Sequence, residues 1–76
     1  MDTNKFIQNF ADLFEDTEVS LITPETKFRD LDEWSSLLAL STMSMIDEEY
    51  DVQLTAEQMR GANTVQDLIN IVNNQA

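Results

Sequence analysis

The side chains available for chemistry in this chain are limited to hydroxyls, carboxylates and a few cations. The sequence has 76 residues and contains neither cysteine nor histidine. These absences exclude thiolate nucleophiles, imidazole bases, disulfides and the usual zinc ligands. A chain of this size also offers little concavity for a catalytic pocket. We therefore do not expect an enzyme, and any sulfur chemistry would need sulfur from a cofactor.

Two short stretches contain the remaining candidates. Ser35 and Ser36 stand directly before the apolar pair Leu37-Leu38, where either hydroxyl can cap a helix by accepting from its free amides. The second stretch is the acidic run Asp47-Glu48-Glu49-Tyr50-Asp51. It lacks the Asp-x-Asp-x-Asp-Gly pattern of a calcium loop. We therefore predict no dedicated metal site, only diffuse binding of Mg²⁺ or Ca²⁺ that relieves repulsion between acids.

The overall charge limits the possible partners. Fifteen acidic and four basic side chains give a net charge of −11. Such a field repels nucleic acid and steers the chain towards basic patches on proteins. Residues 1–6 lack the charged and apolar regions of a signal peptide, and no apolar run approaches the ~20 residues of a membrane span. We expect a cytoplasmic monomer.

The elements that must position these stretches are helices. A chain this short has room for one domain, residues 1–76, and one glycine and one proline disfavour a turn-rich β fold. A first helix should begin near Asp2 or Thr3 and fray near Asp16-Thr17. Residues 18–33 should form a long loop packed onto the bundle, with a turn at 23–26. The predicted buried face of the first helix consists of Phe6, Ile7, Phe10, Leu13 and Phe14.

Three further helices complete the predicted bundle. The second should run from Ser36 to Tyr50, with a core face of Ala39, Thr42, Met43, Ile46 and Tyr50 and a less buried stripe of Leu37, Leu40, Ser44 and Asp47. Residues 55–58 have the form of a capping box and start a short helix that Gly61 ends. Thr64 or Asn63 should cap the last helix, before a polar tail at 73–76. The fold class is all-α, three longer helices and one short. The last helix should bury Val65, Leu68, Ile69 and Val72.

In these features the chain resembles the acyl carrier protein family over nearly its whole length. In that family a Ser-Leu pair opens the second helix, and the helix ends in an apolar–acidic–acidic–acidic–aromatic–Asp run. Ile46 through Asp51 match that run. Counting back from it identifies Ser36, rather than Ser35, as the modified position.

The resemblance implies a carrier with a covalent cofactor. A phosphopantetheinyl transferase would join 4′-phosphopantetheine from coenzyme A to Ser36, and the thiol of this arm would carry acyl groups as thioesters. A helix N-terminus favours the phosphate, because its free amides carry partial positive charge. Partners would be acyl-transfer or acyl-activating enzymes with basic docking patches. The residues that they would recognise are Leu37, Leu40, Asp47 and Glu48.

The chain departs from the family pattern near this serine. Ser35 stands where an acid is usual, and Glu33-Trp34 where a small residue is common. Leu38 and Ser41 take positions on the exposed front of the second helix, where carriers of fatty acid synthesis often have carboxylates. We therefore hypothesise a specialised carrier that serves its own small enzyme set. Trp34 is interpreted as a loop aromatic that closes over the core.

Two alternatives stay open from the sequence. An aminoacyl or D-alanyl carrier, or a discrete peptidyl or polyketide carrier, would share the fold and the serine. An acidic helical interaction module with no covalent cofactor would share the fold and the charge.

Overall fold

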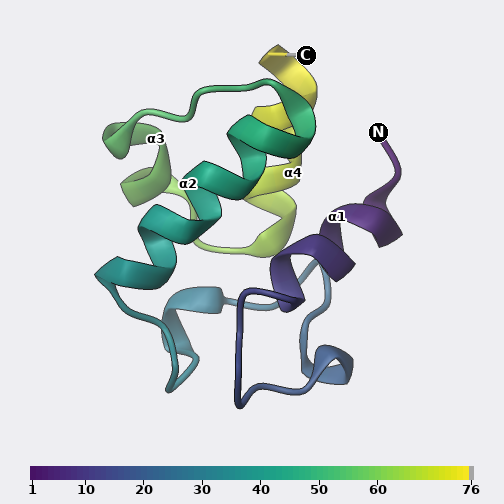
Figure 1. Ribbon diagram of the computed structural model, residues 1–76, viewed down its shortest axis with the longest axis vertical. Coiled ribbons are helices and arrows are strands. Elements are labelled where there is room, and N and C mark those ends of the chain that lie inside the picture. Colours follow the sequence, from purple (N-terminus) through teal and green to yellow (C-terminus); the bar gives the residue numbers. More distant parts are fainter. Residues whose placement is uncertain (76) are drawn as a thin grey trace.

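The structure, a computed structural model that describes residues 1–75, contains four α-helices and a long first connection (Figure 1). The helices are α1 (Thr3–Ala11), α2 (Ser36–Tyr50), α3 (Ala56–Gly61) and α4 (Val65–Gln75). The connection contains two 3₁₀ turns, η1 (Val19–Leu21) and η2 (Phe28–Asp30). The described residues include no strand, which confirms the predicted all-α bundle of three longer helices and one short one. None of these helices is long and apolar enough to cross a membrane.

Helix α1 begins as predicted and ends earlier than predicted. The Asp2 carboxylate accepts from the amides of Asn4 and Lys5 at 3.0 and 3.3 Å, which caps the first turn. After Ala11 the chain tightens, and the Phe14 amide donates to the Ala11 carbonyl at 3.0 Å. This tighter turn keeps Phe14 on the buried face. The apolar periodicity therefore continues beyond the end of the α-helix itself.

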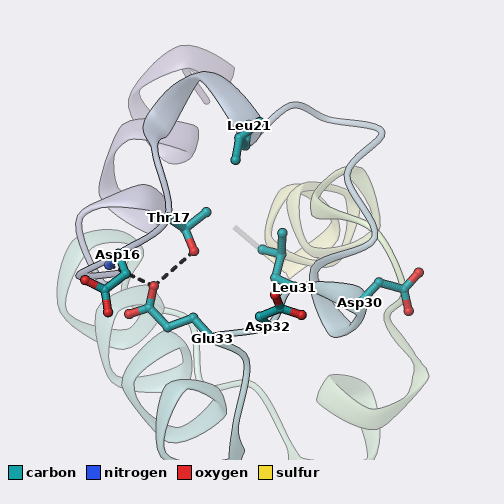
Figure 2. Close-up of a pocket in the computed structure, with 7 residues that line it drawn as sticks. All are labelled: Asp16, Thr17, Leu21, Asp30, Leu31, Asp32 and Glu33. Carbon is teal, nitrogen blue, oxygen red and sulfur yellow. Dashed lines mark hydrogen bonds between the residues drawn. The ribbon is translucent and has the colours of Figure 1, made fainter.

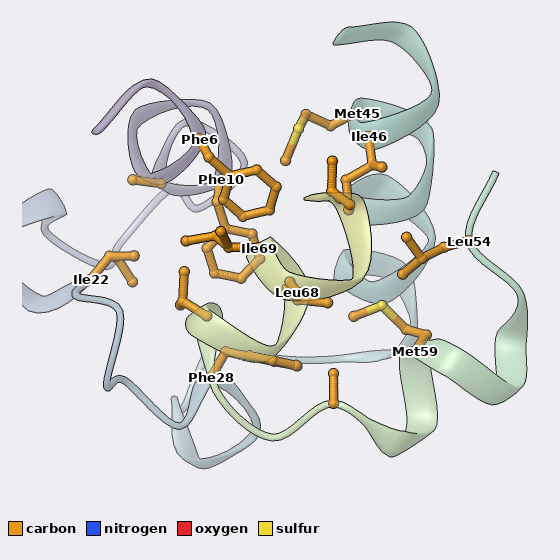
Figure 3. Packing of buried hydrophobic residues seen from close by; sticks show 14 of the residues in the cluster. Phe6, Phe10, Ile22, Phe28, Met45, Ile46, Leu54, Met59, Leu68 and Ile69 are labelled. Atoms are coloured by element: carbon orange, nitrogen blue, oxygen red, sulfur yellow. The ribbon is translucent and has the colours of Figure 1, made fainter. Parts of the chain in front are cut away.

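The core lies where α1, α2 and α4 meet (Figure 3). Phe10 packs edge-on against Phe28, with ring centroids 5.9 Å apart. Trp34 packs on Phe28 at 4.7 Å, so it closes over the core as the sequence predicted. The side chains with almost no exposed surface are Phe6, Phe10, Phe28, Thr42, Ile46, Val65, Leu68, Ile69 and Val72.

The long loop packs onto the bundle only in part. Ile22 and Phe28 are buried, but Val19 and Leu21 are 50% and 60% exposed. The 3₁₀ turn explains the difference, because it directs consecutive side chains to different sides and only Ile22 reaches the core. The predicted turn at 23–26 is confirmed, since the Thr26 amide donates to the Thr23 carbonyl at 3.0 Å.

Helix α2 has the predicted bounds but buries a broader face. Thr42 and Ile46 are buried as predicted, whereas Ala39, Met43 and Tyr50 are only partly buried. The placement of Leu38 on the exposed front was wrong, because its exposed fraction is 9% and it belongs to the core. The buried residues of α2 include Leu38, Thr42 and Met45, which follow each other at helical spacing. The face that α2 turns towards α1 and α4 is therefore rotated around the helix axis from the predicted core face. Ser41, also assigned to the front, is half-buried.

The last two helices begin at the predicted caps. The Thr55 hydroxyl accepts from the Gln58 amide and the Gln58 side chain accepts from the Thr55 amide, both at 3.0 Å. The Thr64 hydroxyl accepts from the Asp67 amide at 3.2 Å. The predicted inward face of α4 is buried in full. The predicted polar tail was wrong for residues 73–75, which continue the helix, and Ala76 lies outside the described residues.

Candidate functional site

The two serines at the start of α2 have different roles. Ser35 is the N-cap: its backbone is extended, with φ −156° and ψ 172°, and its hydroxyl accepts from the Leu38 amide at 3.3 Å. Ser36 is the first helical residue and is exposed. Within residues 1–75 no hydrogen bond involves its side chain. The structure therefore assigns the cap, which the sequence left open, to Ser35 and leaves the Ser36 hydroxyl free to react.

Glu33 fixes the segment that leads into this helix (Figure 2). Its carboxylate accepts from the amides of Glu15 and Asp16, at 2.6 and 3.0 Å, and from the Thr17 hydroxyl at 3.0 Å. The bond from the Glu15 amide is the main reason why the pKa of Glu33 lies below its ordinary value, and the other two bonds act in the same direction. Because these donors follow α1, Glu33 ties the end of α1 to the entry of α2. No local sequence pattern indicates this contact.

The hollow around Glu33 is acidic. Asp16, Asp30 and Asp32 line it together with Glu33, and Leu21 and Leu31 supply apolar surface. Figure 2 shows the Asp30 carboxylate pointing away from Glu33. Among the residues that the structure describes, no group of three or more such side chains is arranged to hold a metal ion.

A second groove runs directly beside Ser36. Ser36 itself lines it, and the opposite wall comes from α3. Two of the four basic side chains of the chain, Arg29 and Arg60, lie there. Sequence reasoning missed both, because no motif connects them with the serine. The full lining is Arg29, Trp34, Ser35, Ser36, Ala39, Leu40, Met43, Ala56, Met59 and Arg60.

Arg29 is part of the wall of this groove. Its Nε donates to the Ala62 carbonyl at 2.9 Å, and its Nη2 donates to the Met59 carbonyl. Its guanidinium also lies 5.5 Å from the centre of the Phe28 ring. Both arginines are exposed to solvent, but Arg29 joins the loop to the end of α3, whereas no hydrogen bond from Arg60 is found within residues 1–75.

The other predicted site residues are spread along α2. Leu37 and Leu40 lie near Ser36, with 73% and 62% of their surfaces exposed. Asp47 and Glu48 are exposed in the last turns. A rise of 1.5 Å per residue places Asp47 about 16 Å from Ser36 along the helix axis. The structure thus brings the two leucines to the serine and leaves the acids at the far end.

The arrangement suits an anionic, flexible group attached to Ser36. The hydroxyl is free, the amides of the first turn supply partial positive charge, and two guanidinium groups lie in the neighbouring groove. The rest of that groove is mainly apolar, so it can also contact an aliphatic segment.

Comparison with known proteins agrees with this geometry. The family model of the phosphopantetheine attachment site matches residues 4–72, a span that includes Ser36 and most of all four helices. No curated protein and no solved structure matched the chain. Domains of this family bind 4′-phosphopantetheine covalently and are modified and used by separate enzymes. The match confirms the predicted family and cofactor: this chain belongs to the phosphopantetheine attachment site family of carrier domains.

Proposed function

We propose that this chain is an acyl carrier protein and that Ser36 holds its 4′-phosphopantetheine arm. The observation that carries the proposal is the division of labour between the two serines. Ser35 is engaged as the helix cap, whereas Ser36 presents an exposed hydroxyl without a hydrogen bond in the described chain. A nucleophile that must enter a transferase active site needs this accessibility.

The modification needs only a hydroxyl from this chain. Ser36 Oγ attacks the phosphorus of coenzyme A that bears the pantetheine group. An oxygen–phosphorus bond forms to Ser36, the bond to the leaving 3′,5′-ADP breaks, and the hydroxyl proton passes to a base of the transferase. The first-turn amides of α2 favour the phosphodiester by about 0.3–1 kcal/mol. Once bound, the cofactor supplies the thiol that carries acyl groups as thioesters.

We further propose that partners dock along α2. Leu37 and Leu40 offer exposed apolar contacts near Ser36, and Asp47 and Glu48 offer charge towards the far end. From Ser36 to Ile46 the helix has no charged residue. A partner should therefore present an apolar surface near its active site and a basic patch about 16 Å away along α2. This spacing supports a specialised enzyme set. We also propose that residues 1–76 act as one carrier domain, which is monomeric and lies in the cytoplasm.

The carrier proposal is tested by loading and unloading the chain. We would incubate it with acetyl-coenzyme A, Mg²⁺ and a broad-specificity phosphopantetheinyl transferase, then follow intact mass. The expected result is a gain of one acetyl-phosphopantetheine, from which neutral hydroxylamine removes only the acetyl group. Ser36→Ala should gain nothing, whereas Ser35→Ala should still be loaded. If the mass does not increase with a transferase that is proven active on another carrier, the result would favour the alternative of an acidic helical interaction module with no covalent cofactor.

A further inference from the structure

The segment that leads into Ser36 is anchored at three consecutive residues. The Glu33 carboxylate accepts three hydrogen bonds from the chain that follows α1. The Trp34 ring packs on Phe28 in the core, with the ring centroids 4.7 Å apart. The Ser35 hydroxyl caps α2. Within residues 1–75 the side chain of Ser36 makes no hydrogen bond, so its position follows from α2 and from these anchors.

Glu33 is the anchor that connects this segment to α1 (Figure 2). One carboxylate oxygen accepts from the Glu15 amide, and the other accepts from the Asp16 amide and the Thr17 hydroxyl. Neither amide donates to a backbone carbonyl within residues 1–75, so the carboxylate satisfies both. Hydrogen bonds to a charged acceptor are stronger than those between neutral groups. Glu33 therefore holds the start of α2 against residues 15–17.

The same contact gives a reason for one departure from the family pattern. A small residue is common shortly before the modified serine, where this chain has Glu33-Trp34. A glycine or alanine in place of Glu33 could not reach the amides of residues 15–17. The chain would then lose this connection between the end of α1 and the start of α2.

We propose that Glu33 is a positioning residue for the modification of Ser36, which it aligns by fixing the start of α2 against the end of α1. The proposal rests on Ser36 as the attachment site and adds a residue that acts through the backbone, without contact with coenzyme A. Attack on phosphorus needs a closely aligned hydroxyl, and a loosened entry segment would spread the Ser36 hydroxyl over several positions. Loss of the Glu33 bonds should therefore lower kcat, whereas KM depends on the docking residues of α2 and should not change.

The test is steady-state loading of Glu33→Gln by a broad-specificity phosphopantetheinyl transferase with saturating coenzyme A and Mg²⁺. Glutamine keeps the size of the side chain but has one acceptor oxygen and no charge, so it cannot accept all three bonds. We expect kcat to fall about three- to tenfold, less than the ~10²-fold loss that a 1 Å misplacement can cause. The KM for the carrier should stay the same, as expected when docking is unaffected. Circular dichroism at the assay temperature would verify that each variant is folded.

Two variants control for charge and for stability. Asp32→Asn removes an exposed charge that lines the same hollow but takes no part in the three bonds. Asp67→Asn removes a carboxylate that accepts from the Asn63 and Thr64 amides at 2.9 and 3.1 Å, in the first turn of α4. Both variants should keep the kcat of the wild type.

Each possible outcome bears on the proposal. A wild-type kcat for Glu33→Gln would overturn it, as would a raised KM with kcat unchanged, because Glu33 would then be a docking contact. An equal loss of kcat in Asp67→Asn would also overturn it, because the loss would follow stability and not position. If the wild type gains no phosphopantetheine by intact mass, the carrier proposal fails as well, so the two failures are distinguished.

Discussion

The different roles of Ser35 and Ser36 lead to a prediction that needs no cofactor. Replacing an N-cap serine with alanine costs about 0.5–2 kcal/mol of stability. The cap bond from the Leu38 amide to Ser35 Oγ is 3.3 Å long, beyond the usual 2.9–3.0 Å, so we expect the lower half of that range, about 0.5–1 kcal/mol. In a domain of this size 1 kcal/mol shifts Tm by about 4–8 °C, so Ser35→Ala should melt about 2–8 °C lower.

Ser36→Ala should behave differently. Its hydroxyl makes no hydrogen bond within residues 1–75, and alanine is the better helix former by up to about 0.5 kcal/mol. Its Tm should therefore stay the same or rise slightly. Thr55→Ala removes the hydroxyl that accepts from the Gln58 amide at 3.0 Å, a shorter cap bond than that of Ser35, so it is the positive control and should lose at least as much as Ser35→Ala.

The assay is urea and thermal unfolding of the apo chain, followed by circular dichroism at neutral pH. The opposite result, in which Ser36→Ala is destabilised and Ser35→Ala is not, would contradict these roles. In that case Ser36 would be the cap, and its hydroxyl would not be free for modification.

Four further predictions follow from the fold and the charge. Phe28→Ala should lower the free energy of unfolding by about 3–5 kcal/mol, a large part of the total of about 4–11 kcal/mol expected for a chain of this length. Leu21→Ala, at an exposed position, should change it by less than about 0.5 kcal/mol, and chemical denaturation compares the two variants. Glu33→Gln should be less stable than wild type at pH 7. Because the folded pKa of Glu33 is lowered, this difference should shrink as the pH falls from 4.5 through that lowered pKa, and a gap that stays constant with pH in unfolding curves would contradict it. Millimolar Mg²⁺ or added salt should raise Tm, since both screen the charge of −11; an unchanged Tm in calorimetry would mean that self-repulsion does not destabilise the fold. In steady-state kinetics with a partner enzyme, Leu37→Ser should raise KM at any ionic strength, whereas Asp47→Asn should raise it only at low salt.

The features that the sequence predicted correctly depend on neighbouring residues. The start of α1, both bounds of α2 and the caps of α3 and α4 follow from short patterns such as Thr55 with Gln58. Ser36 was selected in the same way, by its distance from the acidic end of its own helix. Local patterns therefore located the elements and the candidate serine.

The features that the sequence did not predict depend on contacts between distant residues. Arg29 reaches the Ala62 carbonyl across 33 positions, and Glu33 reaches the Glu15 amide across 18. The burial of Leu38 depends on how α2 is rotated against its neighbours. Arg60 enters the site only because α3 packs opposite Ser36. Each of these follows from tertiary packing, which no short pattern encodes.

The position of the arm is the most direct test of the account. We would convert the wild-type chain to its holo form, digest it, and fragment the modified peptide in a mass spectrometer to identify the residue that holds the phosphodiester. We expect phosphopantetheine on Ser36 alone, with Ser35 unmodified. Phosphopantetheine on Ser35 would contradict it, because the residue that caps α2 would then also be the nucleophile.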